Sequence, residues 1–390
     1  MLVIAGQRSR ARRVADPISG NASNVHVRVL LTGWAASPWG EHTALVAKPS
    51  WSPGAATGIG SMPGTDPGEA AAVVFGELPE FPHVPELPER GVGADLLGRT
   101  AALLVDIAVE LVPSGYRIAA RPGHVHQRAV DLLRWDLDAF EEAREKTGVT
   151  PQLVKTQFAG PWTLAAGIEL PKGHRVLTDR GALRDFASSM LAGLETHVAD
   201  LKTRTGAPVV VQFDEPTMPE VLEGSLSTPS GYGTVRAIPE PEARDLLATV
   251  VEGAERITGQ PVIVHCCAAR PPVALLRSAG AGAQALDMTL LGGAPAALLD
   301  EIGEAWDDGT TFFLGLVRAT DPGTRPTLSE LAQPALRLVD RLGFNRSILA
   351  ERAVPTPTCG LAGATDEWMR RALALTRDLG KAFVEPPEGW

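Results

Sequence analysis

Pro261-Val-Ile-Val-His-Cys-Cys267 is the stretch from which the fold is predicted most directly. Residues 261–264 are a short apolar, β-branched run, which is typical of a buried strand in an α/β protein. One imidazole and two thiols follow at its carboxyl end. The third and last cysteine, Cys359, lies in the segment Thr358-Cys-Gly-Leu, after another predicted strand. Cysteines gathered at two strand ends are a poor arrangement for filling a core, so we expect them to have a chemical role.

The composition predicts a folded, soluble protein. The chain has 390 residues, of which 44% are hydrophobic, enough for one large domain or two ordinary ones. Its net charge of −10 arises from interspersed acidic and basic residues, so we expect no nucleic-acid partner. Three cysteines argue against a disulfide framework and for a reducing, cytoplasmic location. No apolar run reaches the roughly 18 residues that a membrane helix needs, so we expect no membrane partner.

The first 55 residues differ from the rest of the chain. They contain a basic cluster, Arg8 to Arg13, then a polar stretch and one short apolar piece, Val29-Leu-Leu31. A signal peptide would need a longer apolar segment and a small-residue cleavage site. We therefore expect an irregular or disordered extension over residues 1–55 and one folded domain over residues 56–390.

Strand and helix patterns alternate along that domain. The predicted strands are Ala56–Ser61, Tyr116–Arg121, Gln152–Gln157, Pro208–Phe213, Pro261–His265, Gln284–Asp287, Thr311–Leu316 and Ser347–Ala353. The predicted helices are Gly68–Gly76, Ala94–Val112, Gln127–Thr147, Gly181–Thr205, Pro241–Thr258, Pro271–Ser278, Pro295–Ile302, Leu328–Leu342 and Asp366–Phe383. Eight strands, most of them followed by a helix, predict a (β/α)8 TIM barrel, with a doubly wound sheet as the alternative. Polar residues end at least five of these strands, and a barrel gathers such residues onto one face.

The histidine and cysteines predict a metal site. His265 and Cys267 are two residues apart, so on an extended strand end they point to one side while Cys266 points to the other. A barrel brings Cys359 round to the same ring of strand ends, and Asp287, at the end of the strand between, is the expected fourth ligand. The alternative is that the cysteines are small buried hydrophobes and the histidine is a core residue. Together the set predicts zinc, which suits activation of a substrate thiol because the metal keeps the thiol deprotonated at neutral pH.

Acidic residues follow the strand that ends in Gln212-Phe-Asp-Glu-Pro216. The proline cannot continue the strand, so Asp214 and its neighbour lie at the active face. We expect Asp214 to point inward, where it could hold a substrate ammonium group or relay a proton. A cap on the next helix is the alternative. Glu86, in a proline-rich loop, could help to hold an amine.

Two further strand ends open loops. The glycines of Gly58-Ile-Gly-Ser-Met-Pro-Gly64 let the backbone approach a ligand closely, and Ser61 offers a hydroxyl group and an N–H. The spacing fits neither standard phosphate loop. Phe158-Ala-Gly-Pro-Trp-Thr163 either lines the pocket wall or forms a tight turn.

Taken together, these stretches resemble the carboxyl-terminal catalytic barrel of the cobalamin-independent methionine synthases, from about Thr57 to the end of the chain. The resemblance rests on an ordered set of motifs: Ile59-Gly-Ser-Met-Pro, Gly160-Pro-x-Thr, Asp214-Glu-Pro, His265-x-Cys, Asp287 and Cys359-Gly-Leu. Uroporphyrinogen decarboxylase and the corrinoid-linked thiol methyltransferases are related barrels that share some of this layout.

The resemblance implies a zinc site that binds the sulfur of homocysteine and delivers it as a thiolate to a methyl donor. His265, Cys267 and Cys359 match the family's zinc ligands, and Asp287 aligns with a ligand that is a glutamate in better-known members. Other matches concern the amino-acid substrate: Ile59 and Ser61 with residues at its carboxylate end, Asp214 with an acid near its amine, and Glu86, loosely, with a second such acid.

Three departures from the family pattern affect the methyl donor. Residues 1–56 cannot form the long amino-terminal barrel of the full-length enzymes. A proton-relaying histidine would fall near Ala319-Thr-Asp-Pro322, where this chain has Thr320, and a folate-holding tryptophan would fall near Gly167. The thiol-activating half of the site is therefore kept, whereas the folate-holding half is altered.

We therefore predict a zinc-dependent S-methyltransferase that acts on homocysteine or a similar small thiol. The donor is either a methyltetrahydrofolate or a methylcorrinoid on a partner protein. One alternative is a uroporphyrinogen-decarboxylase-like lyase, in which Arg99, Arg121 and Arg318 would grip substrate carboxylates. Another is a zinc- or thiol-binding barrel without catalytic activity.

Overall fold

The computed structural model describes residues 51–387, so most of the predicted extension, residues 1–50, lies outside the described residues. Six strands form one parallel sheet, in the order β3 (Val154–Ala159), β5 (Val209–Asp214), β6 (Ile263–Cys266), β7 (Ala283–Asp287), β8 (Thr311–Val317) and β9 (Ala353–Pro357). Every residue of β3, β5 and β8 is buried. Strands buried on both faces are expected of a parallel sheet covered by helices.

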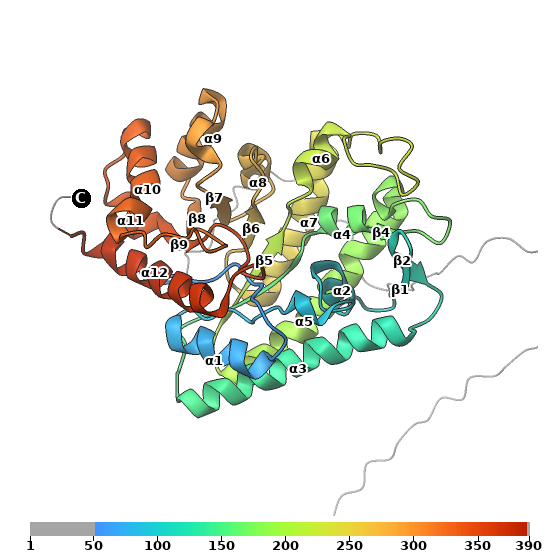
Figure 1. Ribbon diagram of the computed structural model, residues 1–390. Helices are drawn as coiled ribbons and strands as arrows, with labels where there is room; N and C mark the ends of the chain where they lie inside the picture. The colour runs from blue at the N-terminus through green and yellow to red at the C-terminus, as the bar shows by residue number, and fades with distance from the viewer. Residues whose placement is uncertain (1–50, 388–390) are drawn as a thin grey trace, which may run out of the picture. The chain divides into compact units, whose positions relative to one another are not determined.

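Eight helices surround this sheet (Figure 1). They are α1 (Pro67–Glu77), α3 (His124–Thr147), α5 (Arg180–Thr205), α7 (Glu240–Thr258), α8 (Val273–Ser278), α9 (Ala296–Asp307), α10 (Leu328–Leu342) and α12 (Asp366–Val384). Each packs against the next in this order, and α12 packs against α1. The other α-helices within residues 51–387 are α2 (Leu96–Ala101), α4 (Pro161–Gly167), α6 (Met218–Glu223) and α11 (Ile348–Arg352). The fold is thus α/β with a parallel half-barrel sheet, consistent with the predicted barrel.

The ends of α5 show why the helix patterns were readable in the sequence. The side chain of Asp179 accepts hydrogen bonds from the amides of Gly181 and Ala182, which caps the amino end. Gly206 ends the helix with a φ of 70°, a left-handed conformation that favours glycine.

The first edge of the sheet is extended by two segments that pair through single bridges. Ser61 bridges Glu86 and His83 bridges Lys155, both in parallel orientation. The first segment was predicted as the strand Ala56–Ser61. The second, around His83–Glu86, was predicted as a loop because its prolines obscured the strand pattern.

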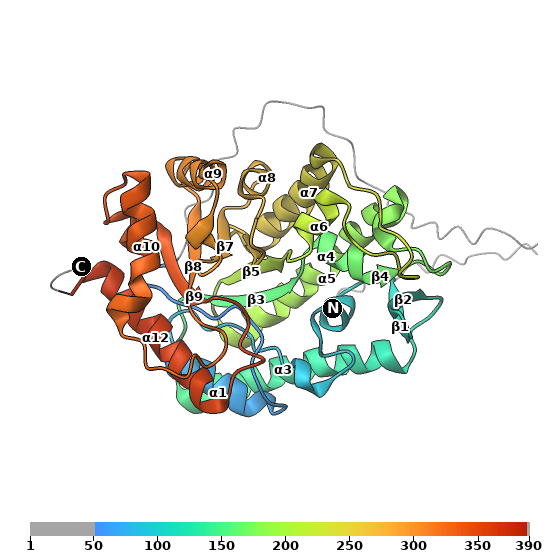
Figure 2. The ribbon, with the colours of Figure 1, turned by 45° about the horizontal axis from the view of Figure 1, so that its top comes forward.

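Between residues 94 and 121, one predicted strand lies in a different sheet and one predicted helix is only partly helical. The predicted strand Tyr116–Arg121 belongs to β2 (Gly115–Ala119), which pairs with β1 (Ala108–Val112) and β4 (Ile168–Glu169) in a separate three-stranded sheet. Figure 2 shows this small sheet on the opposite side of the fold from β8 and β9. The predicted helix Ala94–Val112 breaks after α2, and its second half is β1, which forms a hairpin with β2.

The predicted last strand was also displaced. Residues Ser347–Ala353 form mainly α11, and the strand β9 begins only at Ala353. The apolar pair Ile348–Leu349 is short enough to suit either a helix or a strand. The tertiary structure places Ala353 beside Phe312 of β8, and this fixes the true start.

Aromatic side chains pack together in a buried apolar cluster that includes residues of the sheet. Trp51 stacks on Phe81 at a ring separation of 6.2 Å and meets Phe313 edge-on at 5.4 Å. Ile59 lies in the same buried apolar cluster.

Within residues 51–387, no helix is long and apolar enough to cross a membrane.

Gly193 of α5 provides a test of this packing. A Cβ atom there would lie 1.7 Å from the carbonyl oxygen of Leu103. We expect Gly193→Ala to lower the free energy of unfolding by about 2 kcal/mol or more. In contrast, Gly76→Ala in α1 meets nothing within 4 Å and should raise it by about 0.5–1 kcal/mol through helix propensity. Urea unfolding of both variants measures the difference, and equal effects would contradict the packing described.

Candidate functional site

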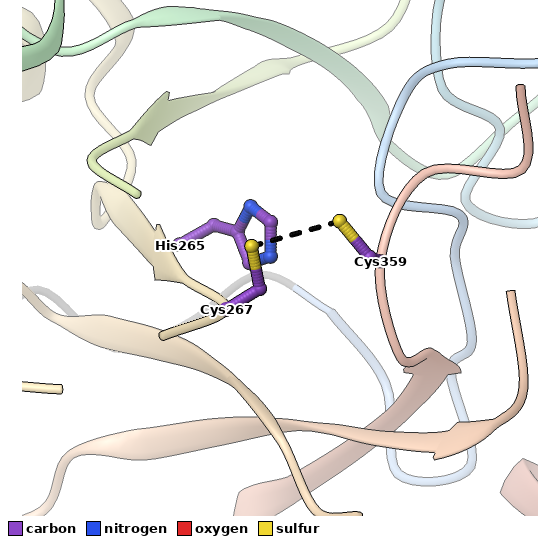
Figure 3. A group of neighbouring side chains, drawn as sticks. All are labelled: His265, Cys267 and Cys359. Atoms are coloured by element: carbon purple, nitrogen blue, oxygen red, sulfur yellow. Dashed lines mark hydrogen bonds between the residues drawn. The ribbon is translucent and has the colours of Figure 1, made fainter. Parts of the chain in front are cut away.

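Three predicted ligands come together at the carboxyl end of the sheet. His265 and Cys267 lie at the end of β6, and Cys359 lies in the turn after β9 (Figure 3). Their ligand atoms are all within 4.8 Å of one another, and the two sulfur atoms are 3.6 Å apart. Cys266 is fully buried in the apolar core, as the alternation along a strand predicts.

The donor set fits a zinc ion. Two thiolates at about 2.3 Å from a tetrahedral zinc would lie about 3.8 Å apart, close to the 3.6 Å between Cys267 and Cys359. The Nε2 atom of His265 is buried and has no hydrogen-bond partner within residues 51–387. A buried polar atom usually has a partner. We therefore expect Nε2 to bind a group, such as a metal ion, through its lone pair.

Asp214 sets the orientation of His265. The strands β5 and β6 pair with these two residues in register, and Nδ1 of the imidazole lies 2.7 Å from Oδ1 of the carboxylate. An Nδ1–H donated to Asp214 leaves Nε2 free as a ligand atom. Burial alone would lower the pKa of His265, but the neighbouring Asp214 and Cys359 raise it to about 9.

The two thiols differ in acidity. The hydrogen bond between the two thiols, aided by His265, holds the pKa of Cys359 well below its usual range. The same hydrogen bond, together with burial, raises the pKa of Cys267. The pKa of Cys359 is therefore lower than that of Cys267.

Asp287 ends β7, as predicted, but lies outside the group formed by the three close ligand atoms. Its Oδ1 atom accepts hydrogen bonds from the amide and the hydroxyl of Thr289, at 2.8 and 2.6 Å. The role of Asp287 as a metal ligand stays a prediction.

The segment Ile59–Ser61 lies beside the candidate metal ligand Cys359. The amide of Leu361 donates to the carbonyl of Ser61 at 2.7 Å. A Cβ atom on Gly360 would lie only 1.9 Å from Oγ of Ser61, so this hydroxyl sits directly against the residue after Cys359. The side chain of Ile59 is buried in the core, and what Ile59 presents to its polar neighbours is its carbonyl.

Glu86 lies beside Ser61 and is buried. Its Oε1 atom is 3.7 Å from Nε of Arg99 and has no hydrogen-bond partner within the described residues. Burial raises the pKa of Glu86 to about 7, with the charge of Arg99 opposing the rise and that of Asp214 adding to it. A partly satisfied buried carboxylate next to Ser61 is suited to a ligand ammonium group.

The stretch Phe158–Thr163 opens a helix. Glu215 accepts hydrogen bonds from the amides of Trp162 and Thr163, at 2.9 and 2.7 Å, at the start of α4. Gly160 is required there, because a Cβ atom would lie 2.3 Å from Oε1 of Glu215. Asp214 thus faces the metal ligands, whereas its neighbour has the structural role.

Lys155 was missed in the sequence. It lies on β3, is fully buried, and donates to the carbonyl of Ile59 at 2.7 Å and to Oε1 of Gln157 and Gln212 at 3.1 and 2.8 Å. Burial lowers its pKa to about 7, and the charges of Asp214 and Glu86 oppose this. The sequence pattern that could have indicated Lys155 was a lysine within a predicted buried strand, where an unpaired charge is costly.

The two positions at which family residues are replaced lie in different surroundings. Thr320 is exposed in the loop after β8. Gly167 ends α4, and a Cβ atom there would lie 2.4 Å from a methyl carbon of Leu97. A tryptophan at position 167 would require Leu97 to move.

Comparison with known proteins identifies the family of the chain. No curated protein matches the chain. The fold resembles a B12-independent methionine synthase from Shewanella sp. W3-18-1 solved with selenomethionine (TM-score 0.53, 12% identity, 85% of this chain and 97% of that one). It also resembles a methyltransferase from Methanosarcina mazei (TM-score 0.51, 14% identity, 85% and 93%). Residues 54–382 match the family model described as the catalytic domain of cobalamin-independent synthases. Because this match spans most of the sequence, the chain belongs to the cobalamin-independent synthase family and is a methyltransferase of that kind.

Proposed function

We propose that the protein is a zinc-dependent S-methyltransferase that methylates homocysteine or a similar small thiol. The observation that carries this proposal is the convergence of His265, Cys267 and Cys359, whose ligand atoms lie within 4.8 Å of one another. The orphaned Nε2 atom of His265 points to the same conclusion.

The chain's own residues would hold the metal and orient its ligands. His265, Cys267 and Cys359 would bind zinc, with Asp287 as the fourth ligand. Bound zinc supplies a positive charge that lowers the pKa of a substrate thiol to near neutrality. Asp214 keeps the proton of His265 on Nδ1, and this fixes the tautomer that can act as a ligand.

Other groups are placed to bind the amino-acid part of the substrate. Within residues 51–387, Oε1 of Glu86 has no hydrogen-bond partner, and Asp214 bonds only through Oδ1. Both carboxylates can therefore accept a substrate ammonium group. The hydroxyl of Ser61 and the backbone of Ile59–Ser61 would bind the substrate carboxylate. Selenomethionine in the Shewanella enzyme supports a ligand of this class.

We propose a methyltetrahydrofolate as the donor. The matched family is described as cobalamin-independent, and this does not support a corrinoid protein as partner. Methyl transfer would be an in-line displacement by the substrate thiolate. The exposed Thr320 and the crowded Gly167 imply that the folate would be held differently from the family pattern.

The alternatives are less well supported. A decarboxylase would need arginines that converge on the pocket. However, Arg99 pairs with Asp136 at 2.7 Å, and Arg121 and Arg318 are exposed. A zinc-binding protein without catalytic activity would have no use for Glu86, a buried residue beside Ser61 whose Oε1 atom accepts no hydrogen bond within residues 51–387.

A complete barrel is a further part of the proposal. We infer that residues 56–390 form one (β/α)8 barrel, with the segments ending at Ser61 and Glu86 as its first two strands. The hydrogen bond from Leu361 to Ser61 supports closure between the segment after β9 and the first strand. The ring formed by the eight helices, which ends with α12 against α1, supports it independently.

Metal content and methyl transfer test the proposal directly. Wild-type protein purified without added metal should hold about one zinc per chain, and Cys359→Ser should lose most of it because a thiolate ligand is removed. Cys266→Ala is the matched control and should keep the metal, since that thiol faces the core. Wild type should also methylate homocysteine from methyltetrahydrofolate. Zinc-loaded protein that is inactive with both this donor and methylcobalamin would refute the methyltransferase proposal.

The role of Asp287 has its own test. If Asp287 is the fourth ligand, Asp287→Ala should weaken zinc binding by at least about 10-fold. Asp287→Glu should tighten binding if the short side chain limits the site. Competition with a chromophoric chelator measures both variants. Unchanged affinity in Asp287→Ala would exclude this residue as a ligand.

Asp214→Asn tests the orientation of His265. Loss of the carboxylate should weaken zinc binding by about 10- to 100-fold, because the imidazole loses the partner that fixes its tautomer. Glu169→Gln is a suitable control, since it removes a buried carboxylate that pairs with Arg117 in the small sheet. Equal zinc affinities in the two variants would show that Asp214 does not support the metal ligand.

A further inference from the structure

Lys155 is a buried cation that the proposed mechanism does not use. Its three hydrogen bonds go to the carbonyl of Ile59 and the side-chain oxygens of Gln157 and Gln212, so they occupy all three ammonium hydrogens. None of the three acceptors is a carboxylate. Burying an ammonium group that makes no direct contact with a carboxylate is costly even with the charges of Asp214 and Glu86 nearby, so the position calls for an explanation other than stability.

The acceptors of Lys155 connect the two halves of the proposed site. Gln212 also donates through Nε2 to the carbonyl of Ile59 at 3.0 Å and to Oδ1 of Asp214 at 2.7 Å. That same Oδ1 atom lies 2.7 Å from Nδ1 of His265. A continuous chain of buried hydrogen bonds thus runs from the segment Ile59–Ser61 to a metal-ligand imidazole.

Gln157 holds the same segment from another side. Its Nε2 atom donates to the carbonyl of Val84 at 2.7 Å, in the segment that pairs with Ser61. A Cβ atom on Gly60 would lie 2.8 Å from Cγ of Gln157, so the backbone at Gly60 rests directly on this side chain. Lys155 and Gln157 therefore fix the position of the Ile59–Ser61 backbone relative to β3.

We infer that Lys155 is a positioning residue that sets the distance between the substrate-carboxylate anchor at Ile59–Ser61 and the sulfur-binding ligands around His265. This inference rests on the proposed function, because it assumes that an amino-acid thiol spans the two sites. It makes Lys155 a determinant of specificity: a thiol that carries a carboxylate at the distance found in homocysteine gains from the anchor, and a thiol without one does not.

The test compares two thiols on zinc-loaded, full-length protein by calorimetry. Homocysteine has the carboxylate, and 3-mercaptopropylamine is the same molecule without it. In wild type, homocysteine should bind more tightly than 3-mercaptopropylamine. In Lys155→Met, this preference should fall by about 10-fold or more, because the anchor loses a charged hydrogen bond. Zinc content and the affinity for 3-mercaptopropylamine should stay unchanged.

Thr156→Val is the matched control, since Thr156 lies next to Lys155 on β3 and its hydroxyl bonds with His197 instead. It should keep the full preference for homocysteine. If Lys155→Met does not fold, Gln157→Leu replaces it and should reduce the preference in the same direction. A preserved preference in the folded variant overturns the inference, as does an equal loss of affinity for both thiols. Wild type that binds zinc without any preference also overturns it, whereas wild type without zinc refutes the proposed function instead.

Discussion

The hydrogen bond between Asp214 and His265 is the interaction on which the site depends. It exists because β5 and β6 are parallel neighbours in a register that sets these two residues side by side at the strand ends. From Asp214, one line of contacts leads to the candidate metal ligand His265 and another leads through Gln212 to the segment Ile59–Ser61. The two parts of the proposed site therefore have one common origin in the pairing of two strands.

The sequence predicted the fold well where one local pattern had one structural solution. The strand at Thr311–Leu316 and the helix at Leu328–Leu342 were found nearly to the residue, because an apolar run and a capped amphipathic helix are unambiguous. The sequence-based prediction of secondary structure was wrong where tertiary contacts decide which structure a segment adopts. Ile348–Leu349 suits a helix or a strand, and Tyr116 is in a strand that pairs, within residues 51–387, with β1 and β4 and not with the main sheet.

The site was predicted from residues that have chemistry visible in the sequence. His265, Cys267 and Cys359 were brought together because the ends of parallel strands meet on one face, and this grouping is present. Lys155 was missed because a lysine in a strand suggests an exposed residue, and only the tertiary structure shows that its three acceptors come from separate strands and a loop. Buried polar networks join residues far apart in the sequence, so no local pattern indicates them.

The contact between Gly360 and Ser61 has a consequence for the synthesis of the chain. Ser61 leaves the ribosome long before Cys359 and Gly360 do. Because Leu361 bonds to Ser61, the first segment of the sheet obtains this partner only after Leu361 has been made. The group of His265, Cys267 and Cys359 therefore cannot form on a nascent chain that ends before Cys359, and the proposed metal binding would follow the synthesis of that segment.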